Sequence, residues 1–168
     1  KLSKVVGMEV LKTNYKKTIY DKFIKGIKDY GMVENGDKIA IGVSGGKDSL
    51  LLLNLFNMLK DEGRIKFDFV GITLDQGYEK KDLERLAEYV DTVQCDYKLY
   101  DTNIWQVVFD EREEKNPCLL CAKMRRGILY KRAEELGCNK LALGHHFDDI
   151  IETALINIFF AGNIKTMV

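Results

Sequence analysis

Short apolar runs alternate with longer amphipathic stretches along this chain. Four runs have the length and composition of buried strands, and they lie at residues 38–43, 67–74, 92–97 and 140–143. The stretches between and after them have helical length and spacing, and they lie at residues 50–59, 80–90, 104–114, 119–136 and 147–160. Helices that alternate with short apolar strands predict an α/β fold with a doubly wound parallel sheet in three α/β/α layers.

The first and last predicted helices of the chain are both amphipathic. Residues 15–30 predict an amphipathic helix with a lysine-rich face, which suits either solvent or a nucleic acid. We therefore divide the chain into an N-terminal basic helical segment, 1–36, and a domain at 37–168. In the last helix one side is apolar and is expected to be buried, and it comprises Ile150, Ile151, Ala154, Leu155, Ile158 and Phe159.

Composition narrows the class of protein. With 168 residues and 46% hydrophobic residues, the chain is large enough for one compact core. Its formal net charge of zero argues against a strongly basic nucleic-acid-binding domain, although local patches remain compatible with it. No stretch has transmembrane length, and the start does not resemble a signal peptide. Four cysteines, two of them in a Cys-x-x-Cys pair, favour a reducing, cytosolic setting with metal or redox chemistry.

The segment Ser44-Gly45-Gly46-Lys47-Asp48-Ser49 joins the first strand to the following helix. A strand that turns through two glycines into a helix presents backbone N–H groups at the positive end of the helix dipole, which suits phosphate. A Walker A loop is excluded because Ile41 and Asp48 stand where it needs glycine and Ser or Thr. A dinucleotide fingerprint is excluded because Ser44 replaces its second glycine. The alternative is a plain turn that caps a helix.

Polar residues also follow two later strands. Asp75 ends the second strand, so it lies either near a nucleotide at the ligand-binding edge of the sheet or merely in a turn. The segment Gly144-His145-His146-Phe147-Asp148-Asp149 follows the fourth strand and faces the same edge. Asp148, Asp149 and Glu152 are candidates to hold Mg²⁺ through water, although acidic residues also suit the first turn of any helix.

Cys118 and Cys121 are spaced so that both sulfurs can bind one metal or one cluster iron. A complete site needs further ligands, for which Cys95 and Cys138 are the remaining cysteines. We expect Cys95 at the end of the third strand, at the same edge of the sheet as the Cys-x-x-Cys pair. Cys138 is expected at the opposite edge of the sheet. Each is alternatively a buried, inert thiol.

Cationic side chains follow the cysteine pair. They suit either the phosphates of RNA or ATP or a solvated helix flank, and they comprise Lys123, Arg125, Arg126, Lys131 and Arg132.

Three segments together resemble the TtcA-type, tRNA 2-thiocytidine synthetase branch of the PP-loop ATP pyrophosphatase superfamily. They are SGGKDS at 44–49, PCLLCAKMRRGILY at 117–130, and GHHFDDIIETALIN with the following FFAGNIKTM between 144 and 167. The resemblance implies a HUP-type sheet of five parallel strands and use of ATP and Mg²⁺ to adenylate C2 of an anticodon-loop cytidine. Sulfur then displaces AMP, with a [4Fe-4S] cluster held by three cysteines.

The resemblance also implies roles for individual residues. Ser44, Gly45, Gly46, Lys47, Asp48 and Ser49 would cradle the phosphates, and Gly144 and His145 would line the nucleotide. Cys118 and Cys121 would be two cluster ligands. We take Asp48, Arg125 and Asp148 as catalytic candidates. The implied partners are tRNA and a sulfur donor such as a cysteine desulfurase, in a cytoplasmic protein that need not contact a membrane and is compatible with a homodimer.

Two features depart from the family pattern. No residue matches the third cluster cysteine, and only four strands are visible, so we expect the sequence to lack a C-terminal part. Two other functions share the loop or the fold. A PP-loop ligase that attaches an amine has no use for the cysteine pair, and a non-catalytic ATP-binding sensor of the universal-stress type has no use for Asp48 or the Asp148–Asp149 pair.

Overall fold

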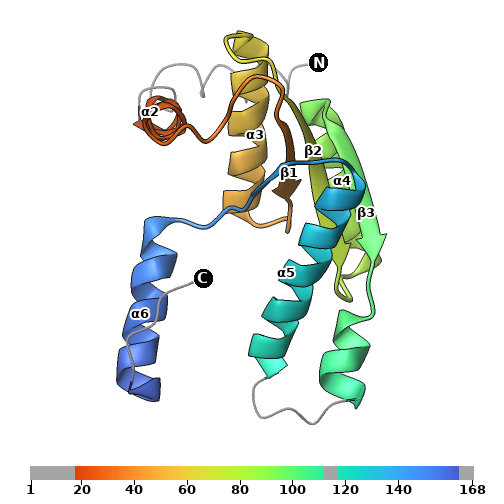
Figure 1. The fold of residues 1–168 in the computed structure, drawn as a ribbon. Coiled ribbons are helices and arrows are strands. Elements are labelled where there is room, and N and C mark those ends of the chain that lie inside the picture. Colours follow the sequence, from red (N-terminus) through yellow and green to blue (C-terminus); the bar gives the residue numbers. More distant parts are fainter. Residues whose placement is uncertain (1–17, 112–116, 163–168) are drawn as a thin grey trace.

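The computed structural model describes residues 18–111 and 117–162, which form a sheet with helices around it (Figure 1). In chain order the elements are α2 (Asp21–Asp29), β1 (Lys38–Gly42), α3 (Lys47–Glu62), β2 (Asp68–Asp75), α4 (Lys80–Val93), β3 (Asp96–Asp101), the π-helical segment η2 (Gln106–Glu111), α5 (Pro117–Glu135), β4 (Lys140–Ala142) and α6 (Phe147–Ala161).

The four strands form one parallel sheet in the order β3-β2-β1-β4, which confirms the predicted α/β class. Ile41 pairs with Gly71 of β2 on one side and with Ala142 of β4 on the other. Because β1 and β4 are neighbours and run the same way, the segments that follow them meet at one edge of the sheet.

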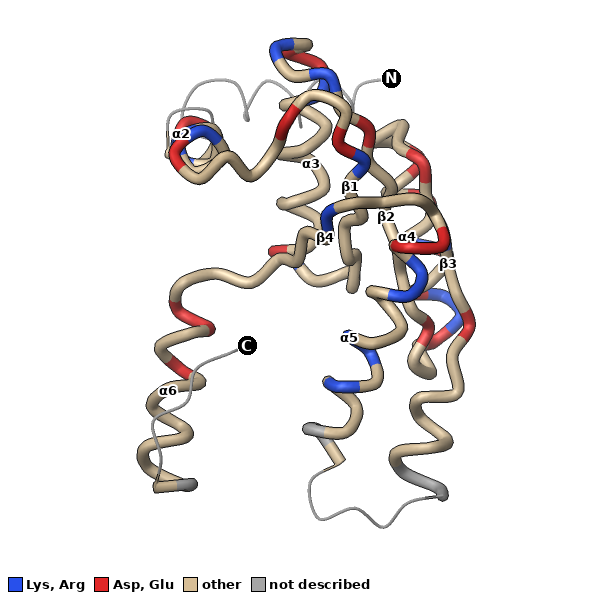
Figure 2. Tube along the Cα trace, in the orientation of Figure 1, with Lys and Arg blue, Asp and Glu red and all other residues tan. Residues whose placement is uncertain are grey.

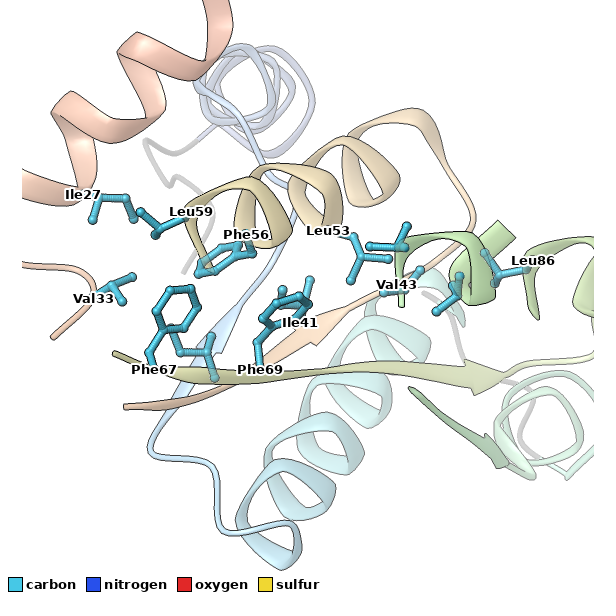
Figure 3. Close-up of a cluster of buried hydrophobic side chains, with 13 residues drawn as sticks. Ile27, Val33, Ile41, Val43, Leu53, Phe56, Leu59, Phe67, Phe69 and Leu86 are labelled. Carbon is cyan, nitrogen blue, oxygen red and sulfur yellow. The ribbon is translucent and has the colours of Figure 1, made fainter. Parts of the chain in front are cut away.

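Alternating residues of the strands separate two hydrophobic clusters. On one face Ile41, Val43 and Phe69 pack against α3 and α4 (Figure 3). On the other face Val70 and Ile72 pack against α5. A strand buried on both faces must be apolar at nearly every position, which explains why β1 and β2 were visible in the sequence as unbroken apolar runs.

The helix α2 lies over the first of these clusters. Ile27 and Val33 are buried there, beside Phe23, whose ring meets that of Phe56 edge-on at 5.4 Å. The described part of the expected 15–30 helix is α-helical only from Asp21, because Thr18–Tyr20 has π-helical geometry. The division of the chain at residue 36 stays a prediction.

An ion pair between a half-buried lysine and a buried carboxylate links the edge strand β4 to the start of β1. Lys140 Nζ lies 2.8 Å from a carboxylate oxygen of Asp37, and the amide of Asn139 donates to the other oxygen at 2.7 Å. Asn139 also accepts from the backbone N–H of Lys38 at 2.9 Å. The hydrogen bond from Lys140 is the main reason why the pKa of Asp37 falls to about 2, against the opposing effect of its burial.

The third strand differs from its expected position. The expected strand at 92–97 is wrong, because α4 continues through Val93 and β3 begins at Asp96. Gln94 ends the helix in the left-handed conformation with φ of 58°, a role for which sequence patterns lead one to expect glycine or asparagine. Cys95 therefore precedes β3 instead of ending it, and lies at the opposite edge of the sheet from the one expected.

The last helix differs from its expected burial. It extends over the predicted residues, but its apolar side is open: Ile158 is 44% exposed and Phe159 is 75% exposed. No helix or strand of the described ranges packs extensively against α6, and Figure 1 shows it standing away from the sheet. The expected buried side is therefore wrong for the described residues, apart from the half-buried Ala154.

Candidate functional site

The loop between β1 and α3 is closed by a serine pair. The Ser49 hydroxyl accepts hydrogen bonds from the backbone N–H and the hydroxyl of Ser44, both at 3.2 Å, and donates to the carbonyl of Gly46 at 2.9 Å. Ser49 is 6% exposed. Its hydroxyl is thus used to shape the loop, which keeps the first turn of α3 next to the end of β1.

The loop presents a helix N-terminus to the edge of the sheet. Gly45 adopts φ of +80°, a conformation that favours glycine, and Gly46 is the N-cap residue of α3. In the described part of the chain no side chain caps this helix, so its first N–H groups remain available for an anion. Phosphate binding by this loop stays a prediction, with which the uncapped helix N-terminus is compatible.

Buried hydrogen bonds hold the loop to β2. The N–H of Val43 donates to the carbonyl of Ile72 at 2.8 Å, and the hydroxyl of Thr73 donates to the carbonyl of Val43 at 2.6 Å. Thr73 is 1% exposed, so this second bond is shielded from water. Both bonds continue the β1–β2 pairing to the residue that precedes Ser44.

The segment after β4 touches the phosphate loop directly. A Cβ atom at Gly144 would lie 2.9 Å from the backbone nitrogen of Ser49 and 3.0 Å from its Cα. Only glycine permits this approach, because the obstructing atoms are backbone and cannot rotate away. The structure therefore brings the first and last predicted motifs into contact.

These segments line a cavity of about 280 Å³ at the carboxyl ends of β1, β2 and β4. Its floor and walls include Ile72 and Leu74 of β2, and Leu129 of α5. Seven of the predicted site residues line it, namely Ser44, Gly46, Asp48, Ser49, Arg125, Gly144 and His145. Apolar walls beside a helix N-terminus and a guanidinium suit a nucleotide with its phosphates on α3.

Of the eleven residues predicted for nucleotide binding or catalysis, the other four are not among the lining residues. Gly45 turns the loop, and Lys47 is 86% exposed with its ammonium 3.2 Å from Asp48. Asp75 accepts hydrogen bonds from the N–H groups of Gly77 and Tyr78 at 2.9 and 3.0 Å, which is turn chemistry. Asp148 is exposed on the first turn of α6. Roles for these four in nucleotide binding stay predictions.

The acidic start of α6 is partly used to cap the helix. A carboxylate oxygen of Asp149 accepts the backbone N–H of His146 at 2.7 Å, and the His146 side chain completes a capping box. Of the three Mg²⁺ candidates, Asp149 is therefore committed to the helix end. Within residues 18–111 and 117–162 no group of three or more His, Cys, Asp or Glu side chains forms a metal site.

The cysteine pair begins α5. Cys121 lies half-buried, and its Sγ is 3.7 Å from Oε1 of Gln76, a cavity-lining residue. Cys118 stands one helical turn earlier. Cys95 and Cys138 lie at the other edge of the sheet, where burial raises the pKa of both thiols. The described residues thus offer the Cys-x-x-Cys pair but do not complete the ligand set of a [4Fe-4S] cluster.

The cations of α5 divide into two groups. Arg125 and Arg126 line the cavity. Arg132 instead stacks over the ring of Tyr100 at 4.7 Å and pairs with Glu135 at 2.6 Å, so it serves the helix and the sheet. Figure 2 shows basic positions along α5 and acidic positions in the first turns of α6.

Sequence reasoning missed two polar cavity residues, Gln76 and Tyr78. Both follow β2 directly, as Asp75 does, so their position after a buried strand was the available signal. The carboxylate of Asp75, which was predicted to lie near the nucleotide, instead shapes the loop that carries Gln76 and Tyr78.

In a comparison with known protein families, residues 12–167 match the model of the PP-loop domain. A tRNA-cytidine(32) 2-sulfurtransferase of Aeromonas salmonicida is 44% identical over 144 residues, which are 85% of this chain and 48% of that protein. One from Haemophilus influenzae is 44% identical over 84% of this chain and 45% of its own length. The chain spans about half the length of the curated relatives it matches.

Solved structures show the same fold. The U34-tRNA thiolase of Methanococcus maripaludis, solved with its [4Fe-4S] cluster, matches with a TM-score of 0.67 and 28% identity, over 86% of this chain and 51% of that one. The NH3-dependent NAD synthetase of Campylobacter jejuni matches with a TM-score of 0.50 and 16% identity, over 86% of this chain and 72% of that one. The second likeness concerns the fold alone.

Proposed function

Because the chain belongs to the family of PP-loop domains, we propose that it is the ATP-binding part of a tRNA thiolase that modifies a cytidine of the anticodon loop. The observation that carries this proposal is the contact between Gln76 and Cys121, which joins the nucleotide cavity to a cysteine pair. The relatives from Aeromonas salmonicida and Haemophilus influenzae carry the name tRNA-cytidine(32) 2-sulfurtransferase, which supports cytidine 32 as the acceptor.

ATP binds with its phosphates at the N-terminus of α3. The backbone N–H groups of the Ser44–Ser49 loop hold the phosphate oxygens, and Arg125 approaches from α5. The C2 oxygen of the cytidine attacks the α-phosphorus. The new bond joins that oxygen to phosphorus, the bond to the bridging α–β oxygen breaks, and pyrophosphate leaves.

Residues around the cavity stabilise the negative charge that develops during this step. Arg125 and the α3 N-terminus act on the phosphates. Asp48, and Asp148 from the nearby start of α6, would hold Mg²⁺, which would supply further positive charge for the phosphates. Sulfur at the oxidation level of sulfide then attacks C2, the C2–oxygen bond breaks, and AMP leaves. The activation of one carbonyl and its replacement by sulfur need no net oxidant.

Cys118 and Cys121 are the residues that would hold an iron–sulfur cluster, which would supply sulfur-transfer chemistry beside the cavity. Since the described residues do not complete its ligand set, no step of the proposed reaction is assigned to the cluster. We further propose a sulfur donor such as a cysteine desulfurase, a homodimer and a cytoplasmic location. Within the described residues no helix is long and apolar enough to cross a membrane.

Two measurements on the anaerobically purified full-length protein test this function. Iron and sulfide counts with an absorbance spectrum report the cluster, and RNA-dependent turnover should release AMP and pyrophosphate. Release of ADP and phosphate would contradict the adenylation step. ATP binding with no AMP formation would favour the sensor.

The cysteine pair separates sulfur transfer from amine transfer. Replacement of Cys118 and Cys121 by serine should abolish thiolation and leave ATP binding within about twofold of wild type. Cys138→Ser is the matched control, because that thiol lies at the far edge of the sheet. Full product formation by the double variant would favour an amine-attaching ligase.

A further inference from the structure

The proposed reaction requires two centres to act on one carbon atom in turn. ATP activates the carbonyl oxygen in the cavity, and sulfur then attacks the same carbon from the side of the cysteine pair. The acceptor base must therefore lie between the two centres. Among the described residues, the two centres are linked by the loop after β2, where Gln76 lines the cavity and contacts Cys121.

This loop is held from three sides. The Asp75 carboxylate accepts the N–H groups of Gly77 and Tyr78, and the hydroxyl of Thr102 donates to the Asp75 carbonyl. Gly77 has φ of +97° and lies against the ring of Trp105. A loop fixed in this way can present side chains in a defined geometry, which is what recognition of a base requires.

The side chain of Gln76 reaches both centres. It lines the cavity together with Ser44 and Asp48, and its Oε1 lies 3.7 Å from Cys121 Sγ. An amide carries both donors and an acceptor, and rotation exchanges them. The Watson–Crick edge of cytosine also offers both kinds of group, so one amide can bind it while remaining beside the sulfur.

Tyr78 supplies the other element of a base site. It lines the same cavity and remains 38% exposed, while Arg125 and Arg126 line the cavity from α5. Proteins bind unstacked RNA bases by stacking them on aromatic rings and by hydrogen bonds to their edges. Arg125 is assigned to ATP, whereas the Arg126 guanidinium suits a phosphate that flanks the base.

We propose that Gln76 and Tyr78 form the subsite for the acceptor pyrimidine, with Tyr78 stacked on the base and the Gln76 amide bonded to its edge. This inference rests on the proposed function, and it assigns specificity to a loop whose polar residues the sequence motifs do not include. The adenine of ATP could stack on Tyr78 in place of the pyrimidine, and the binding measurements below distinguish adenine from the pyrimidine.

Photo-cross-linking locates the base without turnover. An anticodon stem–loop RNA with 5-iodocytidine at position 32 is irradiated with the full-length protein, and the cross-linked peptide is mapped. We expect the cross-link in residues 67–80, at Tyr78, and its loss in Tyr78→Leu. Tyr89→Leu is the matched control, because Tyr89 of α4 is equally exposed at 38% but accepts a hydrogen bond from Asn54 of α3 and is not among the cavity-lining residues. A cross-link that maps outside this loop overturns the proposal.

Equilibrium binding decides between the pyrimidine and adenine. Gln76→Leu and Tyr78→Leu should raise the Kd for the RNA about tenfold and leave the Kd for a non-hydrolysable ATP analogue within twofold. Gln76→Asn, which keeps the amide but shortens it, should fall between wild type and Gln76→Leu. A larger effect on the ATP analogue than on the RNA would place adenine at Tyr78 and overturn the proposal.

Thermal melts show whether each variant is folded before its binding is interpreted. Failure of the inference and failure of the proposed function have different signatures. A cross-link at Tyr78 without RNA-dependent AMP formation contradicts the function alone. AMP formation with a cross-link elsewhere contradicts the subsite alone.

Discussion

Gly144 approaches Ser49 so closely that a Cβ atom on the glycine would lie 2.9 Å from the serine backbone nitrogen. The segment after β4 is thereby seated on the first turn of α3, although the two residues are far apart in sequence. The phosphate loop and the Gly144–His145 segment form one wall of the cavity because of this contact.

Gly144→Ala should therefore push the two segments apart. We expect a loss of about 1–3 kcal/mol in the free energy of unfolding, as for overpacking elsewhere, and a rise of tenfold or more in the Kd for an ATP analogue. Chemical denaturation and calorimetric titration measure these quantities. Gly26→Ala is the control, since a Cβ there meets no atom within 4 Å. Unchanged ATP binding in Gly144→Ala would show that the contact does not shape the site.

The Asp37–Lys140 pair should make stability depend on pH. The pKa of Asp37 lies at about 2 in the folded protein, below its value of 3.8 in the unfolded chain. Its contribution is therefore fully present above about pH 4 and is lost as the pH falls through 2. The shift corresponds to about 2 kcal/mol, which Asp37→Asn should remove near neutral pH.

Urea unfolding at several pH values tests this expectation. The difference in unfolding free energy between wild type and Asp37→Asn should shrink as the pH falls from 4 to 2. Glu34→Gln is the matched control, because Glu34 is 73% exposed and 3.8 Å from the same lysine. We expect it to cost less than about 0.5 kcal/mol. A constant difference across this pH range would argue against the Asp37–Lys140 pair as the cause.

Arg125 and Lys123 lie two residues apart on α5, but Arg125 lines the cavity and Lys123 is not among its lining residues. Arg125→Ala should lower the rate of RNA-dependent AMP formation about 10- to 100-fold, because a guanidinium that stabilises transferring phosphate oxygens is lost. Lys123→Ala should change the rate less than threefold. Rapid-quench measurement of AMP under single-turnover conditions tests both. Equal losses would mean that α5 contributes only a diffuse positive charge.

The sequence allowed the β1–loop–α3 unit to be predicted because several requirements coincide there. An apolar strand buried on both faces, two glycines in the turn and a helix of suitable length all belong to one local segment. The sequence predicted only that this segment and Gly144 lie at the same edge of the sheet. Its close contact depends on the register of β4 beside β1, which local patterns do not encode.

Other features depended on interactions that no local pattern shows. The end of α4 at Gln94 lacks a glycine signal, so the third strand was placed four residues too early and Cys95 at the wrong edge. Gln76 and Tyr78 line the cavity because Asp75 and Thr102 hold their loop in place, and these contacts leave no local sequence pattern. In α6 the apolar pattern was recognised, but its burial depends on what packs against it.

That last helix gives a contrast between two phenylalanines. Phe160 of α6 is 87% exposed, whereas Phe56 of α3 is 4% exposed and packs edge-on against Phe23. In the 168-residue chain, Phe56→Ala should cost about 3–5 kcal/mol in unfolding free energy, as expected for a large core side chain. Phe160→Ala should cost less than about 0.5 kcal/mol, because it gives up little buried area. Urea unfolding followed by circular dichroism measures both. Comparable losses would show that α6 packs onto a core in solution, which its exposure here does not predict.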